Sequence, residues 1–375
     1  MYTSRWQGSA RRERGGDGVV EMLKRRLGRT NFEASVIGFG GGPFIRPAWE
    51  QGVKAVRRAI ELGVNLIDTA RQYGESEAML GEAIKGARDR LFISTKSHFR
   101  TKEEVARSID ESLRQLQVDK IDLIHLHSVD REEDLKQCLA KGGPLEAMRD
   151  ARAGGKVDYI GISGHRSEVL VPALKTGEFD AVIVTYNLIN DDAKQELLPL
   201  AQEMDVGVLA MKPLDGGFLA VPREAAQLRV ADRATSTVEA ALRFALSNPA
   251  IATVLVGMVS VAEVDEDVPM GFVPQKMPLE DRTALQARAR GTLYTFCQGC
   301  GYCLPQCPED IDIPRIFKLQ VLLEQYRMKE YARVTYREVF RQQVEKCTGC
   351  ESCMERCPSQ LDIPELLRKA DLILS

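Results

Sequence analysis

The sequence predicts an α/β fold in which a closed (β/α)8 TIM barrel is followed by a small α-helical domain. Three observations carry this prediction. The chain has 375 residues, and a barrel of this kind takes about 250, which leaves room for one small second domain. Short apolar runs alternate with amphipathic stretches from Val36 onward. Eight of the nine cysteines fall within residues 297–357, which marks the end of the chain as a separate unit.

Eight short apolar runs are the expected strands. They are VIGFGG from Val36, NLIDTA from Asn65, LFISTK from Leu91, IDLIHLH from Ile121, YIGISG from Tyr159, AVIVTYN from Ala181, GVLAMKP from Gly207 and TVLVGM from Thr253. Helices are expected between them, among others over residues 51–62, 102–116, 191–203 and 237–247. Repeated β-then-α units require parallel strands with right-handed crossovers, and closing that sheet gives the barrel. An open doubly wound sheet is the alternative, but GFGGGPF from Gly38 is not the G-x-G-x-x-G turn expected of it.

Composition and terminal segments bound the organisation. Residues 1–20 contain many glycines and charged side chains and are expected to form a disordered leader, followed by the barrel over 21–285 and the second domain over 286–375. The leader lacks an apolar h-region, so a secretory signal is not supported. The longest apolar stretch, 249–262, is shorter than the ~20 residues that span a bilayer. With a formal net charge of -3, we expect a soluble cytoplasmic protein without a nucleic-acid or membrane partner.

The cysteines repeat one spacing twice. Cys297, Cys300, Cys303 and Cys307 precede Pro308, and Cys347, Cys350, Cys353 and Cys357 precede Pro358. This C-x2-C-x2-C-x3-C-P run is the ligand pattern of a bacterial-type [4Fe–4S] ferredoxin, in which the fourth cysteine serves the other cluster. The spacing therefore predicts two cubane clusters with crossed ligands. One is held by Cys297, Cys300, Cys303 and Cys357, and the other by Cys347, Cys350, Cys353 and Cys307.

Zinc and disulfides are the alternatives for these cysteines. A structural zinc site needs four ligands, usually two separated C-x2-C pairs, which leaves the third and fourth cysteine of each run without a role. Disulfides require an oxidising compartment. The segment between the two motifs is long and helical in pattern, so the domain resembles an α-helical ferredoxin-like domain rather than a compact ferredoxin. Cys138 stands alone and is interpreted as an ordinary thiol.

Ionisable side chains end three of the expected strands. Asp68, Lys96 and His127 close the second, third and fourth, and Tyr73 lies on the loop after Asp68. Barrel active sites lie at the C-terminal ends of strands, and a buried lysine requires a partner. We expect Lys96 to pair with Asp68 and to lower the pKa of Tyr73 toward neutrality, so that this phenol can donate or accept a proton. His125, two residues before His127, is expected to lie on the opposite side of the strand as a packing residue.

These residues, within GVNLIDTARQYGESEAMLGEAI, FISTKS, DLIHLH and GISG, resemble the aldo-keto reductases from about Leu27 to about Val268. The resemblance implies that Tyr73 is the proton donor, that Lys96 and Asp68 tune it, and that His127 orients the substrate carbonyl. It also implies hydride transfer from a nicotinamide held across the barrel mouth. A branch of the family with a C-terminal ferredoxin-like extension is similar to this chain end to end.

The resemblance implies cofactor contacts at Ser163, Met211, Pro213, Leu214, Gly216, Gly257 and Ser260. Several positions depart from the family pattern. Gly164 replaces an asparagine, Ile183 a glutamine and Met211 an aromatic ring, and Met258 and Val259 stand where a basic residue usually meets the 2′-phosphate of NADPH. We therefore favour NADH over NADPH. Capping of the next helix is the alternative role for Gly257 and Ser260.

Three functional interpretations follow. In the first, the barrel interconverts a carbonyl and an alcohol, and the clusters connect it to a ferredoxin or flavoprotein partner. In the second, the clusters are structural or sense redox state while the barrel works alone. In the third, the barrel is a non-catalytic binding scaffold for an electron-carrier module. The intact set of Asp68, Tyr73, Lys96 and His127 favours the first.

Overall fold

The computed structural model describes residues 21–42, 49–188, 190–215, 228–230, 233–273, 277–278, 280–284, 297, 303–324, 329–355, 357 and 361–375. The expected leader and the expected domain boundary after residue 285 lie outside these residues. The same is true of two expected site residues, Gly216 and Cys300.

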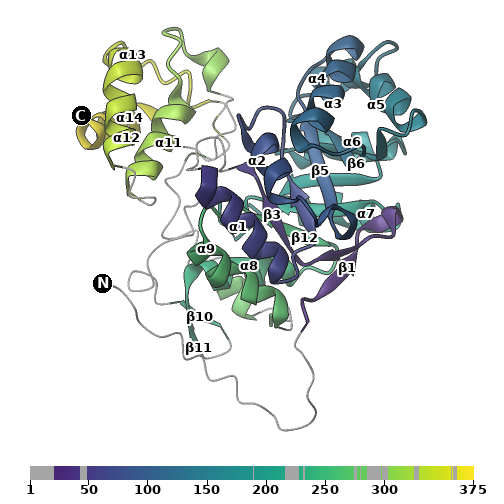
Figure 1. The fold of residues 1–375 in the computed structure, drawn as a ribbon. Coiled ribbons are helices and arrows are strands. Elements are labelled where there is room, and N and C mark those ends of the chain that lie inside the picture. The colour runs from purple at the N-terminus through teal and green to yellow at the C-terminus, as the bar shows by residue number, and fades with distance from the viewer. Residues whose placement is uncertain are drawn as a thin grey trace.

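A closed barrel of parallel strands forms the first domain (Figure 1). Its strands are β3 (Ile37–Gly40), β4 (Leu66–Asp68), β5 (Phe92–Ser97), β6 (Ile121–Leu126), β7 (Val157–Gly164), β8 (Ala181–Thr185), β9 (Gly207–Met211) and β12 (Thr253–Val256). They pair in chain order, and β12 closes the cylinder by pairing with both β3 and β9. The predicted barrel is confirmed, and each of the predicted apolar runs forms one of its strands.

Helices cover the outside of the cylinder. They are α1 (Trp49–Glu61), α2 (Ser76–Ala83), α3 (Lys102–Leu116), α4 (Glu132–Leu139), α5 (Pro144–Ala153), α6 (Ser167–Lys175), α7 (Leu197–Glu203), α8 (Thr237–Leu246) and α9 (Val261–Asp267). The helix predicted over residues 191–203 is instead split into a 3-10 turn, Asp192–Lys194, and α7. Pro199 explains the break, because proline has no N–H for a helical bond and its ring clashes with the carbonyl four residues earlier.

Alternate residues of the strands point into the barrel and fill it. The interior cluster includes Leu66, Phe92, Leu123, Ile183 and Leu209. An antiparallel hairpin of β1 (Lys24–Arg26) and β2 (Glu33–Ser35), which the sequence analysis did not predict, contributes to the same cluster.

The hairpin closes one end of the barrel. The ring of Phe32, beside β2, stacks on Phe92 with centroids 4.6 Å apart, and Phe92 begins β5. Leu27 and Ala34 are fully buried against the same interior cluster. The N-terminal end of the cylinder is therefore covered, which leaves the C-terminal ends of the strands for chemistry.

The second domain is helical, as predicted, and is yellow-green in Figure 1. It consists of α11 (Ile313–Glu324), α12 (Lys329–Thr335), a π-helical turn η8 (Tyr336–Phe340), α13 (Arg341–Glu345) and α14 (Ile363–Leu374). These helices share an apolar core with several of the cysteines. The Tyr336 hydroxyl donates to Oδ1 of Asp371 at 2.8 Å and joins η8 to α14. None of the helices in the described ranges combines the length and apolarity needed to cross a bilayer.

Candidate active site

Four ionisable residues meet at the C-terminal end of the barrel. Asp68 ends β4, Lys96 lies near the end of β5, Tyr73 lies on the loop after β4, and His127 directly follows β6. Nζ of Lys96 is 2.5 Å from Oδ2 of Asp68 and 2.6 Å from the carbonyl oxygen of Thr69. The same ammonium lies 5.1 Å from the centre of the Tyr73 ring. The rings of Tyr73 and His127 meet edge to face at 5.7 Å. The structure thus brings together the four residues that the sequence analysis selected.

Burial dominates the protonation of this group. It raises the pKa of Asp68, while Lys96 and the Ser94 hydroxyl act in the opposite direction. Burial also raises the pKa of Tyr73, and Lys96 offsets this only in part. The expectation that the pKa of Tyr73 falls toward neutrality is therefore wrong for this structure, because desolvation of the phenolate outweighs the neighbouring cation. Burial and then Lys96 hold the pKa of His127 well below its usual range, so its imidazole is neutral.

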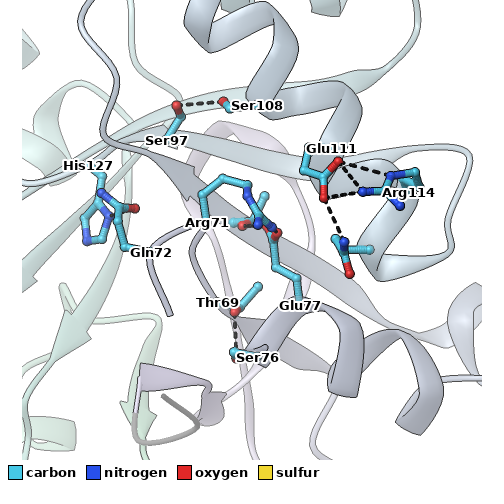
Figure 2. Close-up of polar contacts among 12 residues, drawn as sticks. Thr69, Arg71, Gln72, Ser76, Glu77, Ser97, Ser108, Glu111, Arg114 and His127 are labelled. Carbon is cyan, nitrogen blue, oxygen red and sulfur yellow. Dashed lines mark hydrogen bonds and ion pairs between the residues drawn. The ribbon is translucent and has the colours of Figure 1, made fainter. Parts of the chain in front are cut away.

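The loop that carries Tyr73 is fastened at several points (Figure 2). The hydroxyls of Thr69 and Ser76 are 2.9 Å apart, and Ser76 donates to the carbonyl of Gly41. Arg71 forms an ion pair with Glu77, whose side chain is 1% exposed. The Thr95 hydroxyl donates to the same carboxylate at 2.7 Å. Sequence reasoning missed this ion pair. In RQYGESE the arginine lies two residues before the tyrosine, and the paired glutamate lies four residues after it.

The histidine within β6 corrects an expectation. His125 is fully buried, and its Nε2 lies 3.1 Å from Oγ of Ser94, which in turn donates to Oδ1 of Asp68 at 2.7 Å. Residues two apart on a strand share a face. His125 therefore points to the same side as His127, which is the inner side where Lys96 lies, and not to the opposite side of the strand. It belongs to the hydrogen-bonded surroundings of Asp68.

The expected cofactor residues are spread along the same rim. Ser163 is the last residue but one of β7 and is buried, and its hydroxyl donates to the carbonyl of Leu126 and accepts from the N–H of Ser128. Met211 ends β9, half-buried against the interior cluster, and Pro213 and Leu214 follow it. Ser260 caps α9 by accepting from the N–H of Glu263, the helix-capping role given above as the alternative, and Gly257 lies on the loop before it.

Two departures from the family pattern have a structural explanation. A Cβ on Gly164 would lie 2.6 Å from the carbonyl oxygen of Val129 and 3.2 Å from Oδ1 of Asp130, so the family's asparagine does not fit this backbone. Asp130 holds His165 instead, accepting from its N–H at 2.5 Å and contacting its Nδ1 at 2.9 Å. Ile183 belongs to the apolar interior of the barrel.

In the second domain, Cys307, Cys347, Cys350 and Cys353 line one cavity. This is the crossed set predicted for the second cluster. Burial, with additional effects of the other three cysteines, raises the pKa of Cys353 to about 11. Four thiols around a space, rather than at a point, suit a cubane. In the described part of the chain, no three His, Cys, Asp or Glu side chains converge as one metal ion requires. From the other set, Cys297, Cys303 and Cys357 belong to the core of the same domain.

Each of the two parts of the chain matches a known protein family. Residues 36–275 match the aldo/keto reductase family, and residues 296–361 match a 4Fe-4S dicluster domain. L-galactose dehydrogenase of Arabidopsis thaliana is 30% identical over 305 residues, which cover 72% of this chain and 95% of the relative. Pyridoxal 4-dehydrogenase of Microbacterium luteolum is 24% identical over 332 residues, covering 70% and 96%.

Solved structures agree with this result. The holo form of aldo-keto reductase AKR11C1 from Bacillus halodurans superposes with a TM-score of 0.62 at 26% identity, covering 71% of this chain and 96% of that one. A putative aldo-keto reductase from Pseudomonas aeruginosa gives a TM-score of 0.57, also at 26% identity, and covers 67% and 96%. The chain is therefore an oxidoreductase that belongs to the aldo/keto reductase family and carries a C-terminal 4Fe-4S dicluster domain.

Proposed function

We propose that this protein interconverts a carbonyl and an alcohol by nicotinamide-dependent hydride transfer, with Tyr73 as proton donor and acceptor. We further propose that two [4Fe–4S] clusters connect it to one-electron carriers. The observation that carries the first part is the convergence of Asp68, Tyr73, Lys96 and His127 at the C-terminal end of the barrel. The cavity among four cysteines supports the second part.

The residues at this end have complementary tasks. A bound nicotinamide supplies or accepts the hydride. In reduction, the Tyr73 phenol gives its proton to the carbonyl oxygen, so that hydride and proton together yield the alcohol; in oxidation the proton returns. The raised pKa of Tyr73 keeps the phenol protonated at neutral pH, and the Lys96 ammonium stabilises the phenolate when it forms. His127, being neutral, is suited to hydrogen bonding with the substrate oxygen.

The residues of the rim fit a nicotinamide in part. Met211 faces the interior beside Ile183 and Leu209, and its thioether can cover one face of an aromatic ring. The hydroxyl of Ser163 already bonds two backbone groups, so it contributes by shaping the rim. We infer that the amide is held by fewer side-chain contacts than the family pattern provides.

We infer a preference for NADH from the loop after β12. Glu263 accepts from the Val259 N–H at 2.8 Å, which places a carboxylate beside this loop. Arg58, a cation on the neighbouring helix α1, is paired with Asp265 at 2.7 Å. A ribose 2′-phosphate would be repelled by these carboxylates, whereas a free ribose hydroxyl can donate to one.

The thiols of the second domain fit iron–sulfur clusters by their number and type. Cys307, Cys347, Cys350 and Cys353 would hold one cluster, and Cys297, Cys300, Cys303 and Cys357 the other. Such clusters supply one-electron transfer when bound. A hydride carries two electrons, so exchange between nicotinamide and clusters requires a carrier that handles both, which the flavin of a flavoprotein partner provides. A ferredoxin partner would exchange single electrons with the clusters directly.

A second candidate function is an electron-transfer or redox-sensing protein whose barrel is a non-catalytic scaffold. Gly164 and Ile183 favour it, because they remove two polar contacts that the family makes to the nicotinamide amide. The convergence of Asp68, Tyr73, Lys96 and His127 favours catalysis instead.

The deciding experiment titrates the anaerobically purified protein with NADH and with NADPH, following cofactor fluorescence and cluster absorbance in the same sample. We expect NADH to bind at least about tenfold more tightly, since unfavourable phosphate contacts cost on the order of 1.4 kcal/mol or more. In Tyr73→Phe, we expect carbonyl reduction to fall by about 10²–10⁴-fold while NADH affinity is unchanged. Absence of binding by either nucleotide would reject the catalytic proposal and leave the scaffold.

A further inference from the structure

We infer that Ser94 and His125 are positioning residues that hold the Asp68 carboxylate ionised and thereby hold Lys96 over Tyr73. The inference rests on the proposed function, because it assigns a task to two residues behind the proposed proton donor. Both residues are fully buried inside the barrel, on β5 and β6. Neither touches the Tyr73 ring in the contacts described above.

The directions of the hydrogen bonds follow from the donor inventory. Oδ1 of Asp68 lies 2.7 Å from Oγ of Ser94, and Oδ2 lies 2.5 Å from Nζ of Lys96. An ionised carboxylate only accepts hydrogen bonds, so Ser94 donates its one hydroxyl proton to Asp68. Oγ of Ser94 must therefore accept from Nε2 of His125 at 3.1 Å. This fixes His125 as the Nε2–H tautomer.

The other side of the imidazole agrees with this assignment. Nδ1 of His125 is buried and meets no partner in good hydrogen-bond geometry among the described residues, while the backbone carbonyl of Ile162 lies close enough to the ring to oppose the lowering of its pKa. A Cβ on Gly161 would lie 2.3 Å from Nδ1, so glycine at this position of β7 makes room for the ring. Burial, followed by the charge of Lys96, holds the pKa of His125 well below its usual range. Among the described residues, the titratable groups around it are Asp68 on β4, Lys96 on β5 and neutral His127 directly after β6.

The chain of donors runs from His125 to Ser94 to Asp68, and Lys96 donates to the same carboxylate from the other side. Burial favours the protonated form of Asp68, and the Ser94 hydrogen bond opposes that effect. If Asp68 were protonated, Lys96 would lose its counter-charge and its fixed position 5.1 Å from the Tyr73 ring. Ser94 and His125 thus extend the pH range in which Asp68 can hold Lys96.

Activity tests this with matched variants. We expect Ser94→Ala and His125→Leu to lower kcat about tenfold, the scale of one hydrogen bond to a buried charge. The acid limb of the kcat profile should move up by about one pH unit, because the carboxylate then takes up a proton at higher pH. His125→Gln keeps an N–H donor and should restore both values. Thr253→Val, which removes a buried hydroxyl without a partner in the described ranges, should leave them unchanged. An unshifted acid limb in Ser94→Ala would overturn the inference.

A second readout does not depend on turnover. The chain has four histidines, so the holoprotein labelled with 15N-histidine gives few ring signals, and His125→Gln identifies that of His125. We expect the Nε2–H tautomer, with no titration between about pH 6 and 9, where an ordinary imidazole is titrating or neutral. A proton on Nδ1 would overturn the inference even in an active enzyme. The expected tautomer in a protein without turnover would reject the proposed function alone.

Discussion

Nδ1 of His127 lies 2.9 Å from Oε1 of Gln72. A neutral imidazole carries one N–H, so this contact decides what the other nitrogen offers to a substrate. When Nδ1–H donates to the amide oxygen, Nε2 is an acceptor and suits the hydroxyl of an alcohol. When the amide turns and its NH2 group donates to Nδ1, Nε2–H is a donor and suits a carbonyl. One side-chain rotation therefore sets whether Nε2 of His127 offers a donor or an acceptor to the substrate of the proposed reaction.

Gln72→Glu should separate the two directions of the reaction. A carboxylate only accepts, so it holds the proton on Nδ1 and takes the Nε2–H donor from neutral His127. At pH 8 we expect KM for the carbonyl to rise about tenfold, the scale of one lost hydrogen bond, and KM for the alcohol to change less. Gln72→Met, which lacks both donor and acceptor, is the control. Equal effects of the two variants in both directions would contradict the tautomer argument.

Glu77→Gln should loosen the loop that presents Tyr73. The Glu77 side chain is 1% exposed and that of Arg71 is 21% exposed, so the substitution leaves a largely buried guanidinium without its counter-charge. Losing one partner of a buried pair costs about 3 kcal/mol. We expect a clear drop in melting temperature together with lower kcat, measured by circular dichroism and turnover. Glu75→Gln makes the same chemical change at an exposed position of the same loop and should affect neither quantity.

Asp267 should make the protein less stable as pH rises. Burial, with smaller effects of Glu266 and Glu263, raises its pKa from 3.8 to about 8. Between these two values the folded state binds a proton that the unfolded state releases, so stability falls by up to about 1.4 kcal/mol per pH unit. Asp267→Asn removes this term.

We therefore expect Asp267→Asn to melt at a higher temperature than the native protein at pH 8.5, with little difference near pH 4, in thermal unfolding followed by circular dichroism. Asp265→Asn serves as the control, since its side chain is 46% exposed. A parallel pH dependence of the native and Asp267→Asn proteins would show that Asp267 does not bind the proton.

Iron analysis should reveal which cysteines share a cluster. We expect about eight iron atoms per chain in protein purified without oxygen, from two four-iron cubanes. Cys307→Ser should lose the cluster of Cys347, leaving about four iron atoms, and adding Cys347→Ser should remove no more. Cys138→Ser, a change in the barrel, should retain all the iron. A fall toward zero in the double variant would contradict crossed ligation.

The sequence predicted most of the barrel because its signals are local. Each strand is a short apolar run, and α3 begins and ends where its periodic pattern does. The tetrad was found because charged residues seldom end buried strands without a reason. The two expected cysteine sets rest on spacing alone, and Cys307 lines the same cavity as the cysteines of the second motif.

Other features depend on contacts between distant segments and were missed. The β1–β2 hairpin is short and carries little apolar periodicity, and its position depends on Phe92 and the rest of the interior. The ion pair of Arg71 and Glu77 needs the fold of the loop to bring the two together. Whether the pKa of Tyr73 is raised or lowered depends on the balance between burial and the charge of Lys96, and no sequence motif encodes that balance. The error at His125 was of another kind, since strand geometry alone places it on the inner side.

The hairpin beneath the barrel has a kinetic consequence. Because Phe32, Leu27 and Ala34 cover the N-terminal end of the barrel, the proposed function requires nicotinamide and substrate to enter and leave at the same, C-terminal end. Whichever molecule settles deeper has to come in first and go out last. Cofactor and substrate should then bind and leave in a fixed order. Release of the more deeply bound molecule should be the slow step of turnover.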